Sequence, residues 1–113
     1  MKQQSAGILK GTLGTLVLKS LSWQPLNGFE ITLWLEAQAG GALDIDDSAL
    51  YQALHRLEER GLVTGEWALS EKNRRARYYR LTTAGRAELR TQTAQLLAYA
   101  RAMTSILTSA KPA

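Results

Sequence analysis

Four cationic side chains lie within a six-residue stretch of the chain: Lys72, Arg74, Arg75 and Arg77. Lysine and arginine bind phosphate oxygens through charge-assisted hydrogen bonds, and arginine can form two such bonds in parallel. The surrounding segment is polar and typical of a turn, so these cations are expected to project into solvent. We therefore predict that this stretch contacts the phosphates of a polyanion. The alternative is an ordinary solvated turn, because hairpin turns are often polar.

A second group of polar side chains lies on one side of a helix predicted over residues 47–60. The buried stripe of this helix repeats at i, i+3, i+4 and i+7 and consists of Leu50, Ala53, Leu54 and Leu57. The opposite side carries Ser48, Tyr51, Gln52, His55 and Arg56. Because the major groove of B-DNA admits one α-helix, this side can face a duplex.

The types of these side chains indicate different roles. Gln52 can pair with adenine through two hydrogen bonds, and Ser48 can bond to a base edge or a phosphate. The Tyr51 hydroxyl can reach a phosphate, and His55 or Arg56 can reach the DNA backbone. Base contacts select a sequence, whereas phosphate contacts position the protein. We predict that Gln52 and Ser48 give specificity and that the downstream cations give affinity. Packing for Tyr51 and plain surface positions for the others are the alternatives.

Charge is divided unevenly along the chain. The net charge is +4 at pH 7, yet residues 1–71 carry five Lys/Arg and nine Asp/Glu, whereas residues 72–113 carry nine and one. This division favours one side that faces a polyanion over a uniformly basic surface. A solvated basic end of the chain would give the same numbers.

Several protein classes find no support in the composition. The chain has no cysteine and one histidine, which excludes thiol chemistry and makes a His-based metal cluster implausible. No glycine-rich phosphate loop or Gly-x-Ser-x-Gly motif is present, so we expect no cofactor and no enzyme activity. Lys10 and Lys19 interrupt the apolar character of the N-terminal segment. We therefore expect neither a signal peptide nor a membrane span, and predict a cytoplasmic protein.

Local start and stop signals define the elements that must position these residues. Helices are predicted over residues 8–22 and 27–39, with a turn between them and a capping box of Asn27 and Glu30 at the start of the second. Asp46 is the predicted N-cap of the third helix.

After that helix, Gly61 is the predicted stop signal. Two strands, 62–69 and 76–82, are predicted to form a hairpin around the basic turn, and Thr82 to cap a last helix. This order of elements predicts a mainly α fold with a small β-wing: a winged helix-turn-helix followed by a long C-terminal helix, in one structural domain.

The last helix is predicted over residues 83–108, and its seam has heptad spacing. The seam consists of Leu89, Thr93, Leu96, Ala100, Met103 and Leu107, with Leu97 and Ile106 beside it. A helix of ~26 residues is roughly 39 Å long, more than a small domain can cover. We predict that residues 83–113 form a dimerisation helix, that residues 1–82 form the DNA-binding region, and that the first helix contributes Leu9, Leu13 and Leu16 to the dimer. The alternative is a last helix that folds back on the first helix of its own chain.

Three strings of the sequence resemble one family. They are GTLGTLVLKSLSWQPLNGFEI, LYQALHRLEERGLV and RRARYYRLTTAGRAEL, within roughly residues 8–90. They are similar to the PadR family of bacterial transcriptional regulators, and the short C-terminal segment is similar to its smaller subfamily. The resemblance implies a homodimeric repressor that binds an inverted-repeat operator in double-stranded DNA and is released by a small, often aromatic, effector. It also implies that Tyr51 is the family's recognition-helix tyrosine and that Arg74, Arg75 and Arg77 are its wing cations.

The chain departs from that family in three respects. Gln52 stands where proline is common, and Leu33 and Trp34 stand where polar residues are usual. Residues 83–113 contain no tryptophan, so the stacking of flat drugs on a C-terminal-helix tryptophan is not supported. Packing in the core or the wing is expected for all three tryptophans, namely Trp23, Trp34 and Trp67.

Two other functions remain open from the sequence. The chain could bind DNA with no effector, its activity being set by protein level alone. It could also be a winged-helix protein–protein adaptor that docks a partner through Leu33 and Trp34 and does not bind DNA.

Overall fold

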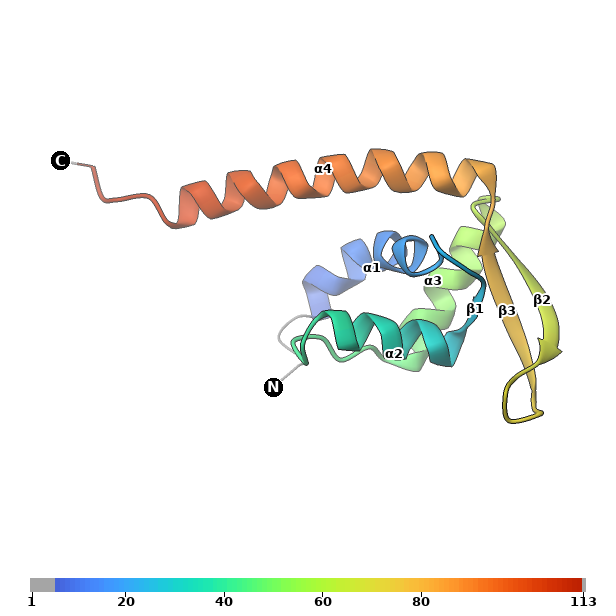
Figure 1. The fold of residues 1–113 in the computed structure, drawn as a ribbon. Coiled ribbons are helices and arrows are strands. Elements are labelled where there is room, and N and C mark those ends of the chain that lie inside the picture. The colour runs from blue at the N-terminus through green and yellow to red at the C-terminus, as the bar shows by residue number, and fades with distance from the viewer. Residues whose placement is uncertain (1–5, 113) are drawn as a thin grey trace.

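The computed structural model describes residues 6–112, with side chains from residue 11 onward. The elements follow the predicted order, with one short strand added (Figure 1). They are α1 (Ala6–Ser20), β1 (Leu26–Asn27), α2 (Gly28–Gln38), α3 (Asp47–Glu59), β2 (Val63–Leu69), β3 (Arg75–Leu81) and α4 (Thr83–Leu107). The predicted mainly α fold with a small β-wing and a long C-terminal helix is confirmed.

The helices begin at the predicted caps. The Asn27 side chain accepts a hydrogen bond from the Glu30 backbone N–H at 2.9 Å, and the Glu30 carboxylate accepts one from the Asn27 backbone N–H at 3.0 Å. Asp46 accepts from the backbone N–H of Ala49 at 3.1 Å and so starts α3. Each cap satisfies amide groups that have no partner within the helix, which is why these positions could be located from residue types alone.

The sheet has the order β1-β3-β2, and both pairings are antiparallel. β2 and β3 form the predicted hairpin. β1 was not predicted: Leu26 and Asn27 pair with Tyr79 and Tyr78, where the sequence indicated a turn and a helix cap. Two residues are too few to show strand alternation, so this pairing left no periodic signal.

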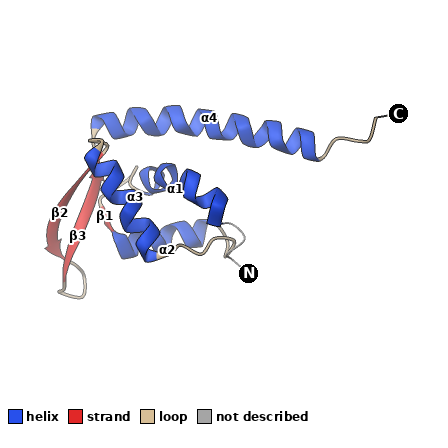
Figure 2. Ribbon diagram, turned by 180° about the vertical axis from the view of Figure 1, so that it is seen from behind, coloured by secondary structure: helices blue, strands red, loops and turns tan. Residues whose placement is uncertain are grey.

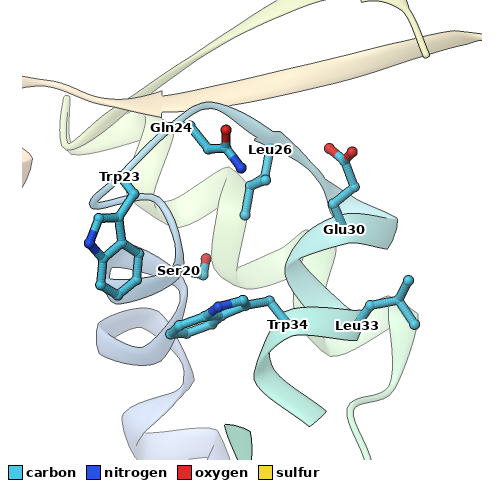
Figure 3. Close-up of a pocket in the computed structure, with 7 residues that line it drawn as sticks. All are labelled: Ser20, Trp23, Gln24, Leu26, Glu30, Leu33 and Trp34. Atoms are coloured by element: carbon cyan, nitrogen blue, oxygen red, sulfur yellow. The ribbon is translucent and has the colours of Figure 1, made fainter. Parts of the chain in front are cut away.

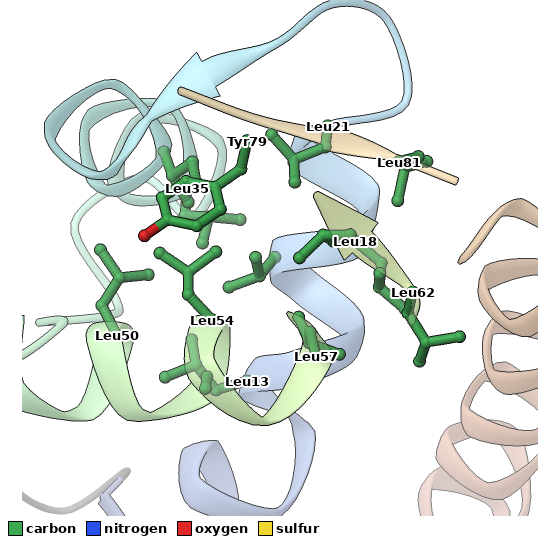
Figure 4. Packing of buried hydrophobic residues seen from close by; sticks show 14 of the residues in the cluster. Leu13, Leu18, Leu21, Leu35, Leu50, Leu54, Leu57, Leu62, Tyr79 and Leu81 are labelled. Carbon is green, nitrogen blue, oxygen red and sulfur yellow. The ribbon is translucent and has the colours of Figure 1, made fainter. Parts of the chain in front are cut away.

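The core lies between α1, α2, α3 and the inner face of the sheet (Figure 4). α3 contributes its predicted stripe, and β3 contributes Tyr79 and Leu81. Leu13 of α1, predicted at a dimer contact, is only 2% exposed and packs in this core. A buried position in its own protomer leaves Leu13 no free surface for a partner.

α4 is joined to the end of α3 by close contacts. The Thr82 hydroxyl accepts from the Gly85 N–H at 2.9 Å and donates to the carbonyl oxygen of Gly61 at 2.7 Å. The Thr82 N–H donates to the Leu62 carbonyl at 3.1 Å. Gly85 is buried against that same carbonyl so tightly that a Cβ would overlap it. The start of α4 therefore has a fixed position relative to α3.

From this junction α4 runs along α1 and continues well past it (Figures 1 and 2). Thr15 of α1 donates a hydrogen bond to Gln92 of α4, and Leu89 packs against the core. The proximal part of α4 thus folds back on its own first helix, as the alternative reading expected. α1 has 15 residues and α4 has 25, or about 22 and 38 Å of helix, so α1 cannot cover the rest. None of the helices in residues 6–112 is long and apolar enough to cross a membrane.

Candidate nucleic-acid interface

The outer side of α3 presents the predicted polar residues to solvent. All five are exposed: Ser48, Tyr51, Gln52, His55 and Arg56. The His55 ring lies 3.4 Å from the Glu59 carboxylate, one turn further along the exposed side. Gln52 and Ser48 have no side-chain partner within residues 6–112, so their hydrogen-bonding groups are free for a ligand.

Tyr51 has a defined orientation even though it is half exposed. Its hydroxyl and ring edge lie against Gly28, the first residue of α2, so closely that any side chain at Gly28 would collide with them. A glycine here lets α2 approach the exposed polar side of α3. Tyr51 is therefore both a packing residue and an exposed one, with 50% of its surface accessible.

The turn between β2 and β3 is ordered by its own hydrogen bonds. The Ser70 N–H donates to the Arg74 carbonyl at 2.7 Å, and the Asn73 N–H donates to the Ser70 carbonyl at 2.8 Å. Asn73 adopts a φ of 58°, a left-handed conformation that asparagine tolerates well. This turn places Lys72 and Arg74 at the tip of the wing.

On the inner face of the wing, Arg75 lies over an aromatic ring. Its guanidinium carbon is 4.8 Å from the centroid of the Trp67 ring. Trp67 is 57% exposed, so it is a platform on the wing surface and not a core residue. The sequence did not assign Trp67 to the candidate site, although strand pairing of Leu69 with Arg75 and of Trp67 with Arg77 makes the two side chains diagonal neighbours.

Arg77 differs from the other wing cations in its surroundings. It donates to the Glu58 carboxylate of α3 at 2.5 Å, and its side chain is 32% exposed. Its guanidinium lies 5.7 Å from the Tyr79 ring centroid. Burial raises the pKa of the Tyr79 hydroxyl, and the charge of Arg77 offsets part of that rise. Arg77 was predicted to bind phosphate, but here it ties β3 to α3 and its charge is balanced by Glu58.

Some of the wing cations have no acidic partner and remain available to a ligand. Across the described part of the chain, the ion pairs engage His55, Arg60, Arg77 and Arg80. That leaves three exposed wing cations without an acidic partner: Lys72, Arg74 and Arg75. The Arg77–Glu58 ion pair joins the wing to α3, so the hairpin that carries these cations packs beside the helix that carries the free polar groups. The described part of the chain contains no cluster of side chains suited to a metal ion.

The predicted dimerisation residues differ in their surroundings. Leu9 lies outside the described side chains, and Leu13 is in the core. Leu16 and Leu89 are half-buried against that core. Toward the end of α4 most side chains are exposed to solvent. They include Leu97, Tyr99, Ala100, Met103, Ile106 and Leu107. Leu96 is half-buried at the boundary.

Three helices with an exposed polar helix beside a basic hairpin define a winged helix-turn-helix protein. The model of the family described as "Transcriptional regulator PadR-like family" matches residues 17–91, more than half of the chain. The chain belongs to this family of transcriptional regulators, and the resemblance found in the sequence is confirmed. The family consists of regulators and not of enzymes.

Solved structures with the same architecture are similar over most of the chain. A PadR family transcriptional regulator from Eggerthella lenta is 28% identical, with a TM-score of 0.75 and coverage of 96% of this chain and 92% of the other. A transcriptional regulator from Thermoplasma acidophilum is 27% identical, with a TM-score of 0.76 and coverage of 93% and 99%.

Bacillus subtilis PadR, solved in complex with operator DNA, is 22% identical with a TM-score of 0.64. That likeness covers 90% of this chain and 51% of the other, and at this identity it shows the fold alone. A search of curated proteins gave no match.

Proposed function

We propose that this protein is a homodimeric repressor that binds an inverted-repeat operator in double-stranded DNA. α3 lies in the major groove with Ser48 and Gln52 toward the bases, and the wing places Lys72, Arg74 and Arg75 on flanking phosphates. The observation that carries the proposal is that these three cations have no acidic partner and lie on a hairpin that packs beside α3, whose outer side carries free polar groups. The operator complex of Bacillus subtilis PadR, a protein of the same fold, supports DNA as the partner.

The dimer in this proposal rests on α4. Residues 83–113 form the dimerisation segment, and residues 1–82 form the DNA-binding region. Ile106 and Leu107 are 72% and 81% exposed, and Leu97 is 54% exposed. Apolar side chains that repeat along one long helix are covered when a second helix packs against them. Two-fold pairing then presents two copies of α3 to an inverted repeat, about 34 Å apart.

Regulation by a small aromatic effector, and action in the cytoplasm where the DNA is, are part of the same proposal. A different function is favoured by one observation: Leu33 is 51% exposed next to Trp34, which suits the adaptor that docks another protein. The unpaired wing cations favour DNA over this alternative, because a protein-docking module has no need of them.

Fluorescence anisotropy against DNA from upstream of the gene, with a scrambled duplex as control, tests the proposal. Tight binding to the upstream DNA is expected, with a log–log salt slope of roughly −5 to −7 if a dimer neutralises about six to eight phosphates.

Gln52→Ala should cost ~1–3 kcal/mol for the operator and little for the scrambled duplex. Arg74→Ala with Arg75→Ala should weaken both alike and reduce the slope by about one per lost contact in each protomer. A dimer that ignores duplex DNA across genomic fragments would instead support the adaptor.

A further inference from the structure

A surface pocket with two indole rings lies on the side of α2 that the core does not use (Figure 3). Trp23, from the loop after α1, and Trp34, from α2, have ring centroids 5.4 Å apart and a tilt of 56°. The pocket has a volume of about 340 Å³ and is also lined by Ser20, Gln24, Leu26, Glu30 and Leu33. This volume is within the range of small-molecule sites, which run from about 300 to 1,000 Å³. Trp23 remains 63% exposed, although the sequence indicated a packing role for it.

The chemistry of the lining favours one class of ligand. Two indoles offer flat surfaces to a planar molecule, and two leucines add apolar contact. Glu30 is the only charged residue of the lining, and its carboxylate disfavours an anionic ligand. Lys19 Nζ lies 4.7 Å from the Trp23 centroid, so a cationic ligand at this ring would have to take the place of Lys19. A planar aromatic cation meets the first two conditions, since it can stack on one of the two tilted indoles and pair with the Glu30 carboxylate.

The pocket is connected to both DNA-facing elements through a short segment. Leu26 lines the pocket and is also a β1 residue, paired with Tyr79 of the wing strand β3. The next residue, Asn27, caps α2 and pairs with Tyr78. Gly28 follows directly in the chain, and the Tyr51 hydroxyl of α3 packs closely against it. A ligand that displaces Leu26 therefore acts on a segment that contacts both the wing and α3.

We propose that the Trp23–Trp34 pocket is an effector site for a planar aromatic cation, and that its occupation lowers DNA affinity by shifting β1. The proposal rests on the proposed function for its DNA readout, but ligand binding itself can be measured without DNA. Displacement at Leu26 would disturb the pairing of β1 with β3 and the contact between Gly28 and Tyr51. Both contacts orient groups that face DNA, so their loss disfavours the bound state.

The first test measures binding of 9-aminoacridine, a planar cation at neutral pH, to the purified protein in the absence of DNA. Acridine-9-carboxylate serves as an anion with the same ring system. Trp23→Ala is expected to weaken 9-aminoacridine binding about tenfold. Glu30→Gln should do the same while keeping the helix cap, because glutamine also completes a capping box. Trp67→Ala, at an exposed tryptophan on the wing, is the matched control and should bind the cation normally.

The second test adds the operator duplex and compares 9-aminoacridine in the wild type and in Trp23→Ala. Any effect of the dye on free DNA is the same for both proteins. Release of DNA from the wild type but not from Trp23→Ala supports the proposal.

The ligand site is overturned by absence of dye binding, by equal binding of the anion, or by dye binding that is unchanged in both Trp23→Ala and Glu30→Gln. Binding at the pocket with no change in DNA affinity overturns the coupling through β1. A protein that binds the dye but no DNA at all contradicts the proposed function and leaves the ligand site supported.

Discussion

At the scale of single residues, the wing cations are not equivalent. Arg74 is free at the tip, Arg75 lies over the Trp67 ring, and Arg77 is bound to Glu58. A guanidinium that rests on an indole loses less conformational freedom when it meets a phosphate, because the ring already restricts its rotamers. Trp67 is therefore a positioning residue for Arg75.

We expect Trp67→Ala to weaken binding to operator and random DNA alike, by ~0.5–1 kcal/mol, since the ring supports a phosphate contact and touches no base. Anisotropy titrations of the two duplexes measure this. In an Arg75→Ala background, Trp67→Ala should have almost no further effect, because the contact it supports is already gone. Fully additive losses from the two substitutions would show that Trp67 acts independently of Arg75.

Tyr79 gives the fold a dependence on alkaline pH. Its pKa is raised above the ordinary value of 10.0, mainly by burial. The folded chain therefore holds the phenolic proton more tightly than the unfolded chain. This stabilisation is fully present below the unfolded pKa and is lost as pH rises through the folded one. Urea unfolding at neutral pH and at about pH 11 should show a steeper loss for the wild type than for Tyr79→Phe. Parallel losses in the two proteins would assign the alkaline sensitivity to other groups.

Much of the candidate site could be predicted from the sequence, because it depends on residues close together in the chain. The i, i+3, i+4, i+7 stripe of α3 fixes which side is exposed, and so identifies Ser48 and Gln52. Partners distant in sequence could not be predicted. Arg77 meets Glu58 across 19 positions, and Trp23 meets Trp34 across two elements. Strand alternation puts Arg77 and Tyr79 on one face of β3, but no local signal identifies the acid opposite Arg77.

At the scale of elements, helix ends were predicted well and their contacts were not. Caps such as Asn27 and Thr82 act within four residues, so they are visible in the sequence. β1 escaped prediction because its two residues carry no pattern. The overlap of α4 with α1 was predicted only as the alternative, since heptad spacing shows an apolar face and not the chain that covers it.

The close contact at Gly85, where α4 packs against Leu62, can be tested by substitution. Gly85→Ala would place a methyl group against the Leu62 carbonyl, where nothing can give way except backbone. We expect a loss of ~1–3 kcal/mol in the free energy of unfolding, as in an overpacked core. Gly11→Ala in α1 is the control, because no atom lies within 4 Å of its added carbon. There helix propensity predicts a gain of up to ~1 kcal/mol. Equal rises in melting temperature for both variants would contradict the tight junction.

At the scale of the whole molecule, the shape is dominated by α4. The longest dimension is 63 Å against 32 and 21 Å for the others, because the helix extends past the winged domain. A monomer with this shape leaves a row of large apolar side chains in water. The proposed dimer removes that exposure and places two recognition helices on one duplex.

Leu97→Ser combined with Ile106→Ser tests this arrangement. Both side chains are exposed in the protomer, at 54% and 72%, so the folded monomer should lose little stability. We expect sedimentation to show a shift from dimer to monomer, together with weaker binding to an inverted repeat. Gln95→Ala, an exposed polar position of the same helix, should leave the assembly unchanged. A double variant that remains dimeric would place the interface elsewhere.

The locked junction between α3 and α4 has a consequence for how a dimer would measure its operator. The Thr82 hydroxyl donates to the carbonyl oxygen of Gly61, just after the end of α3, and Arg60 at the C-cap of α3 lies 3.3 Å from Glu88 of α4. In the proposed dimer, the two α4 helices would then set the distance and the angle between the two copies of α3. One inserted base pair turns a half-site by about 35° and shifts it by ~3.4 Å, which a stiff joint cannot follow. Such a protein would select the gap between half-sites as strictly as the bases within them.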